Sequence, residues 1–295
     1  MTRLLELLAV GLSLGMLYAL IAMGFVIIYK GTRVVNFAQG SLLALGAYAV
    51  ARIAPSAGFW AAAAAGIAIT VAGALLIRWL LSWARSPDHM ALAIATIGVD
   101  IVLTTDLTRR IGPDVLSMLD PWGAATVRLA GVTIPQARIA AMVVAVVILG
   151  LLLALFRYTG WGVAMRAASS DPEAASLMGI RLGRVATVSW LIGGALAAGA
   201  GVFMSTFPSA GLDSHSSTIA LAAIPAVILG GLDSTHGAII GGVTVGMAKT
   251  LTAGYGSELS FLGAGFGDVM PYVLMVAVLM WRPSGLFGTR EFIRV

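Results

Sequence analysis

The sequence contains no cysteine and few charged residues. The absence of cysteine excludes a disulfide framework, thiolate metal sites and a cysteine nucleophile. Only 11% of the 295 residues are charged, whereas a soluble domain carries about 25%. Hydrophobic residues make up 59% of the chain, and its mean hydropathy is +0.98. A water-soluble protein of this length could not bury so much apolar surface, so the composition indicates an integral membrane protein.

Apolar segments long enough to cross a bilayer, about 20 residues each, recur along the whole chain. The first run, from Leu7 to Ile28, exceeds the roughly 7–15 residues of a cleavable signal core, so we expect it to stay as the first span. The pattern predicts an all-α polytopic membrane protein, a bundle of about eight to nine transmembrane helices in one domain, residues 1–295. The expected spans are 5–29, 36–53, 58–81, 90–107, 138–156, 185–206, 218–232, 238–254 and 268–282.

The basic residues indicate how the spans are oriented. The net charge is +5, but the basic residues are scattered between apolar segments and form no continuous basic surface that could bind nucleic acid. We therefore expect no nucleic-acid partner. Cytoplasmic loops carry an excess of Lys and Arg. We therefore assign the richer set of connections to the cytoplasm: Lys30, Arg33, Arg78, Arg85, Arg157, Arg166, Arg181, Arg184, Arg282, Arg290 and Arg294. The N-terminus is then outside, the C-terminus is cytoplasmic, and the long 108–137 segment faces the exterior.

Glycines are abundant and regularly spaced within the expected spans. Gly237 and Gly241 lie four residues apart, as do Gly242 and Gly246. Residues four apart share one face of a helix, and small residues there let two membrane helices approach closely. The spacing predicts tightly packed helices at these four positions.

The stretch RAASSDPEAASLMGIRLGRV, residues 166–185, has the local signals of a short helix. Asp171 can cap its first amides, and Pro172 suits the first helical position. Glu173 favours the positive end of the helix dipole, and Gly179 can end the helix in the left-handed conformation. About two turns result, a length that is marginal in isolation. The helix is therefore expected either to dock in a groove of another protein or to serve as an interfacial linker.

A polar turn lies at the start of the span expected at 36–53. Asn36, Gln39 and Ser41 surround the conformationally permissive Gly40. Irregular backbone at membrane depth is tolerated where it faces protein or an aqueous cavity. These residues are candidates to line the substrate path, and the alternative is that they only cap the span.

Four charged residues fall within the expected spans, where a charge costs about 2.5–3.5 kcal/mol at mid-membrane and suggests a function by default. They are Asp100, Asp106, Lys249 and Asp268. Asp106 and Asp268 lie near the ends of their spans, where water can solvate their side chains. Asp100 and Lys249 lie deeper in their spans. One hypothesis is that these two residues form an ion pair with each other.

The sequence lacks the short motifs of nucleotide-binding and hydrolytic sites. It has no G-x-x-x-x-G-K-[ST] phosphate loop, no H-E-x-x-H and no G-x-S-x-G. Its three histidines, His89, His215 and His236, are widely spaced. We expect no catalytic residue, no metal site and no cofactor in this chain. An ion-coupled secondary transporter and a membrane enzyme remain as alternatives.

Four segments resemble one known family. Glu173–Gly179 matches the E-A-A-x-x-x-G core of the cytoplasmic loop of ABC importer permeases. Residues 11–48, 224–246 and 282–288 are similar to the opening, the later glycine-rich pair and the closing turn of the branched-chain amino-acid permeases of the LivH and LivM kind, with a length closer to the LivH type. The order of the four matches is that of the family.

The resemblance implies the permease subunit of a binding-protein-dependent ABC importer in the bacterial inner membrane, translocating branched-chain or related small amino acids. Urea or a short amide is an alternative cargo. The implied partners are the lipid bilayer, cytoplasmic ATPase subunits that bind ATP and Mg, an extracytoplasmic solute-binding protein, and a second permease subunit, either LivM-like or another copy. The implied coupling loop covers about 160–184, with these coupling residues: Arg166, Asp171, Pro172, Glu173, Ala174, Ala175, Leu177 and Gly179.

Overall fold

The computed structural model describes residues 2–84, 88–129, 132–206, 211–213, 222–258 and 265–289. Eleven helices and two strands make up this described part. The helices are α1 (Thr2–Thr32), α2 (Gln39–Ala57), α3 (Phe59–Ser82), α4 (His89–Ile111), α5 (Gln136–Tyr158), α6 (Gly160–Ser170), α7 (Pro172–Leu177), α8 (Leu182–Thr206), α9 (Ile224–Gly230), α10 (Thr235–Gly254) and α11 (Phe266–Trp281). The strands are β1 (Thr126–Leu129) and β2 (Val132–Pro135).

Five helices are long and apolar enough to cross a membrane, namely α1, α3, α4, α5 and α8, and α11 is a shorter apolar helix. The chain is therefore a helical, multi-pass membrane protein, as the composition predicts. The span expected at 218–232 is helical only over α9, and its first residues lie outside the described part. At a rise of about 1.5 Å per residue, the seven residues of α9 are too short to cross a bilayer alone. The expected count of eight to nine is thus not confirmed.

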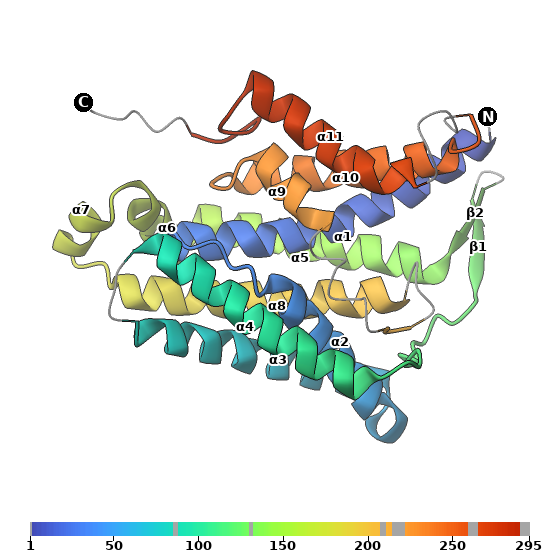
Figure 1. The fold of residues 1–295 in the computed structure, drawn as a ribbon, viewed down its shortest axis with the longest axis horizontal. Coiled ribbons are helices and arrows are strands. Elements are labelled where there is room, and N and C mark those ends of the chain that lie inside the picture. Colours follow the sequence, from blue (N-terminus) through green and yellow to red (C-terminus); the bar gives the residue numbers. More distant parts are fainter. Residues whose placement is uncertain are drawn as a thin grey trace.

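Helix α1 forms the centre of the bundle. It is apolar on all sides, and a helix of that kind is stable only when it is surrounded. Every residue from Leu17 to Ile28 is buried. Helices α5, α8 and α10 pack around it, and α2, α3 and α4 form a layer beyond α8 (Figure 1).

The glycines of α10 lie at close helix contacts. A Cβ on Gly242 would lie 2.4 Å from the backbone nitrogen of Ala19, and one on Gly246 would lie 2.3 Å from the Cα of Gly15. Gly237 and Gly241 face α9 instead, since a Cβ on either would lie 2.1 Å from a carbonyl oxygen of that helix. The two glycine pairs thus occupy two different faces of α10.

A two-stranded hairpin departs from the predicted all-α fold. β1 and β2 pair antiparallel, with Val127 opposite Ile134 and Arg128 opposite Thr133. Five of the eight strand residues are β-branched, which favours this pairing. The segment was read from sequence only as a long exterior connection, because two runs of four residues carry too little periodicity to stand out. The hairpin lies at the end of the bundle opposite α7 (Figure 1).

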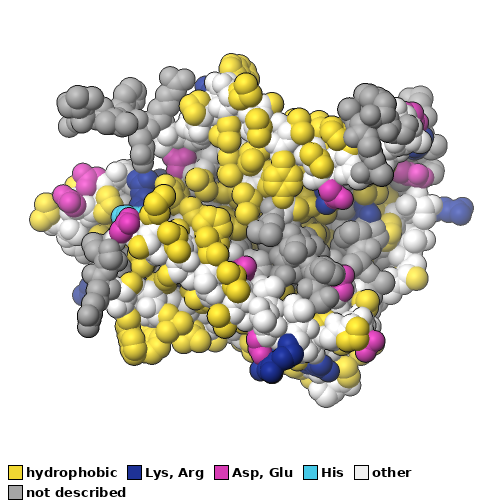
Figure 2. All heavy atoms as spheres, viewed as in Figure 1, with side chains coloured by type: hydrophobic (Ala, Val, Ile, Leu, Met, Phe, Trp, Pro, Cys, Tyr) yellow, Lys and Arg dark blue, Asp and Glu magenta, His cyan; other side chains and the backbone are white. Residues whose placement is uncertain are grey.

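The two ends of the long axis carry most of the charge. Hydrophobic side chains cover much of the face between them, whereas basic and acidic side chains gather mainly toward the ends (Figure 2). The start of α1 and the end of α11 lie at opposite ends of that axis (Figure 1). Arg85, Arg290, Arg294 and His215, and most of the 207–217 connection, lie outside the described residues.

Candidate functional site

The 160–184 segment contains two helices, α6 and α7, where the sequence predicted one. α7 begins as its residues dictate, because the Asp171 carboxylate accepts a hydrogen bond from the Ala174 amide at 2.9 Å and Pro172 is the first helical residue. It ends at Leu177, and Gly179, which follows the C-cap Met178, has a φ of +83°. The amide of Ile180 donates to the carbonyl of Ala175 at 3.1 Å across this turn. α7 is therefore closed at both ends by its own residues.

α7 presents its side chains away from the bundle. Only Ala175 is buried, whereas Leu177 is 88% exposed and Met178 is 84% exposed. α7 packs against α6 and α8 and lies beyond the ends of the long helices (Figure 1). Two adjacent apolar side chains at the end of so short a helix leave a small apolar surface that no described segment of the chain covers.

The remaining predicted coupling residues are divided between the two helices. Ala174 and Glu173 lie in the exposed first turn of α7. Arg166 lies on α6 and donates a hydrogen bond to the Phe156 carbonyl near the end of α5. Arg166 thus ties α6 to α5, while Glu173 is exposed.

A buried polar network surrounds the start of α2. Asn36, Gln39 and Ser41 are fully buried. The Asn36 side-chain amide donates to Gln39 Oε1 at 3.1 Å, and Gln39 Nε2 donates to the carbonyl of Gly193 on α8 at 3.2 Å. Gly24 of α1 leaves room for Gln39, since a Cβ there would lie 2.4 Å from Nε2. The predicted path residues therefore link the α1–α2 connection to α8.

Helix α4 supplies the other half of this network. Thr96 Oγ1 accepts a hydrogen bond from the Phe37 amide at 3.0 Å, and Asp100 Oδ1 accepts one from the Ser41 amide at 3.2 Å. Figure 1 shows the chain running back from the end of α1, so that α2 begins well inside the bundle. The amides of Phe37 and Ser41 thus find side-chain acceptors on α4 away from water, as irregular backbone at membrane depth requires.

The deep charges do not pair with each other. Lys249 Nζ lies 2.8 Å from Asp268 Oδ1, and Asp100 instead accepts from the Ser41 amide. Asp268 is exposed, so the Lys249–Asp268 pair joins α10 to α11 near one end of the bundle. Among the described residues there is no group of three or more side chains able to hold a metal ion.

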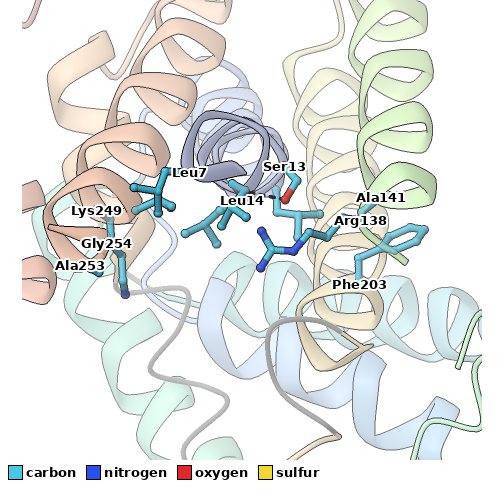
Figure 3. Close-up of a pocket in the computed structure, with 12 residues that line it drawn as sticks. Leu7, Ser13, Leu14, Arg138, Ala141, Phe203, Lys249, Ala253 and Gly254 are labelled. Carbon is cyan, nitrogen blue, oxygen red and sulfur yellow. Dashed lines mark hydrogen bonds between the residues drawn. The ribbon is translucent and has the colours of Figure 1, made fainter. Parts of the chain in front are cut away.

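A cavity of about 390 Å³ lies between α1, α5, α8 and α10. Its walls are largely apolar, with Leu7, Leu14 and Phe203 among them, and Lys249 lies at its α10 side. Arg138 is 8% exposed and extends from α5 into the cavity toward Leu14 (Figure 3). The volume falls within the roughly 300–1,000 Å³ typical of small-molecule sites. An apolar cavity containing a guanidinium can accommodate an aliphatic group together with a carboxylate.

Sequence reasoning missed this cavity. The one local signal is Arg138 itself, an arginine in the first turn of a strongly apolar helix. The residues that approach Arg138 come from helices far away in the chain, and no local pattern connects them.

The long apolar helices, packed around a buried central helix, define a multi-pass helical membrane protein. The family model described as the permease component of the branched-chain amino acid transport system matches residues 7–279. The chain belongs to this family.

Curated relatives match over nearly their whole length. The high-affinity branched-chain amino acid transport system permease protein LivH of Escherichia coli K12 is 30% identical, over 97% of this chain and 96% of the relative. BraD of Pseudomonas aeruginosa, a permease protein of the same description, is 29% identical over the same shares. Among solved structures, PsaBC from Streptococcus pneumoniae in complex with Fab aligns over 95% of this chain and 91% of that chain, with 14% identity and a TM-score of 0.47.

Proposed function

We propose that this protein is the permease subunit of a binding-protein-dependent ABC importer in the inner membrane, and that it translocates branched-chain or related small aliphatic amino acids. The observation that carries the proposal is the family match over residues 7–279, together with relatives named for this transport over nearly their full length. The cavity around Arg138 supports it, because its apolar walls and guanidinium suit an aliphatic amino acid.

The driving force comes from separate ATPase subunits that bind ATP and Mg. α7 is the coupling helix, and its exposed Leu177 and Met178 enter a groove on one of these subunits. Glu173 offers an ionised acceptor to that subunit at the exposed start of the helix. Closure of the ATPase subunits then displaces α7 and, with it, α6 and α8. Such rigid-body movement switches the bundle between two packed states.

The topology follows from the distribution of basic residues. α1 to α5, α8, α10 and α11 cross the membrane, and α9 completes a ninth, broken crossing. The end with α7 is cytoplasmic and the end with the β1–β2 hairpin is external, in agreement with the excess of Lys and Arg at the α7 end. A solute-binding protein docks at the external end. A second permease chain, either LivM-like or another copy, completes the pore.

Reconstitution of the permeases with the ATPase subunits and the binding protein in vesicles tests this function. We expect leucine uptake that requires ATP. In Glu173→Gln, substrate-stimulated ATP hydrolysis and uptake should fall about tenfold, since a hydrogen bond to a charged group contributes about 1.5–3 kcal/mol. Glu6→Gln, at the opposite end, is the matched control and should behave as wild type. Uptake driven by an ion gradient without ATP would contradict the proposal.

A further inference from the structure

A second pocket, of about 520 Å³, lies at the α7 end of the bundle, where α1, α5 and α6 meet the start of α10. Four basic side chains from these four helices line it: Lys30, Arg157, Arg166 and His236. Neither the docking of α7 nor the cavity around Arg138 accounts for this concentration of positive charge.

The basic groups retain donors for a ligand. Lys30 Nζ donates one hydrogen bond, to the Asp233 carbonyl at 2.8 Å, out of the three that an ammonium can make. Arg157 lies over the Tyr158 ring at 5.6 Å. Asp233, an acid whose charge acts on Lys30, also accepts a hydrogen bond from the Thr289 amide at 3.1 Å. The pocket therefore carries a net positive charge from Lys30, Arg157 and Arg166, and three like charges held together favour a bound anion.

An apolar strip on α5 leads into the pocket. Val143, Val146, Val147 and Leu151 are 53–61% exposed and share one face of this membrane-spanning helix with Gly150, Ala154 and Arg157. A Cβ on Gly150 would have no atom within 4 Å, so this part of the face is open. A surface that is apolar along a span and basic at its end matches one ligand shape, an acyl chain joined to an anionic headgroup.

We propose that this pocket binds the headgroup of an anionic phospholipid, with an acyl chain lying along the exposed face of α5. Arg157 and Tyr158 end the span and so lie at headgroup depth, where basic pockets between helices recognise anionic lipids. Because Arg166 of the pocket lies on α6, which leads directly into α7, a bound lipid would also hold the base of α7 in place. The site does not depend on which end of the bundle is cytoplasmic.

Native mass spectrometry of the full-length chain, released from micelles that contain defined lipids, tests the proposal. Palmitoyl-oleoyl phosphatidylglycerol should be retained, and phosphatidylcholine with the same chains should be retained more weakly. Arg157→Gln removes one exposed charge and should weaken phosphatidylglycerol binding about fivefold, since one basic residue contributes about that factor near an anionic surface. Arg184→Gln, an exposed arginine at the same end but outside the pocket, is the matched control and should retain the lipid as wild type does.

Several outcomes would overturn the assignment. Equal retention of the two lipids would show that the headgroup charge is not recognised. An equal loss in Arg184→Gln would show diffuse surface attraction rather than a site. Full competition by glycerol 3-phosphate would indicate a soluble phosphate ligand, because the acyl strip would then contribute nothing. Unchanged lipid retention in Arg157→Gln, with loss of binding to the ATPase subunit, would assign the pocket to that subunit.

Discussion

The contact between α1 and α10 makes a quantitative prediction for Gly242→Ala. The added Cβ would lie 2.4 Å from the nitrogen and 2.5 Å from the Cα of Ala19, whereas ordinary contacts begin at 3.4 Å. Both neighbouring atoms belong to the backbone of a buried helix, so no side chain can rotate away. The two helices must therefore separate locally by about 1 Å.

The cost of this separation follows from two effects. Overpacking of a tight contact typically destabilises a protein by about 1–3 kcal/mol. Moreover, a gap of about 0.5–1 Å loses a quarter to a half of the dispersion energy of the atoms beside it. Because van der Waals packing largely replaces the hydrophobic effect between membrane helices, we expect the upper part of this range, about 2–3 kcal/mol.

Thermal unfolding of the purified protein in a fixed detergent measures this effect. Gly242→Ala should lower the unfolding temperature and reduce the yield of monodisperse protein. Gly199→Ala is the matched control, because a Cβ on Gly199 of α8 would have no atom within 4 Å. That variant should be neutral or slightly stabilised, as alanine favours helix by up to about 1 kcal/mol over glycine. Equal unfolding temperatures for the two variants would refute the close contact between α1 and α10.

Two further substitutions examine the cavity and the polar network. Arg138→Gln should raise the KM of leucine uptake about tenfold, since it removes a charged donor from the cavity; a KM unchanged in labelled-leucine assays would exclude Arg138 from substrate binding. Asp100→Leu should lower the unfolding temperature, because the Ser41 amide would lose its acceptor at a cost of about 1–3 kcal/mol. Asp100→Asn keeps an acceptor and should be nearly as stable as wild type. If the unfolding temperature fell equally in both variants, the negative charge of Asp100, and not its role as an acceptor, would be what stabilises the protein.

Local signals were sufficient to predict most of the long helices and the ends of α7. The apolar runs locate α1, α3 and α5 within a few residues, because a spanning helix must satisfy its own backbone and needs only length and hydrophobicity. α7 is equally local, since its cap, first proline and terminating glycine all lie within nine residues. These elements depend little on what packs against them.

Other features depend on contacts between distant segments and were not predictable in this way. The face that each glycine pair presents is one example, because Gly241 and Gly242 are adjacent in sequence yet contact different helices.

Asp100 shows how a long-range contact changes the interpretation of a residue. As a charge within a span it suggested a functional group by default. In the fold it accepts the amide of Ser41, 59 positions earlier in the chain, in the first turn of α2. That turn needs an acceptor from outside, because Ala38, which precedes it, provides no side-chain cap, and the positive end of the helix dipole favours a carboxylate there. The structural role of Asp100 is therefore to support the start of a helix inside the bundle.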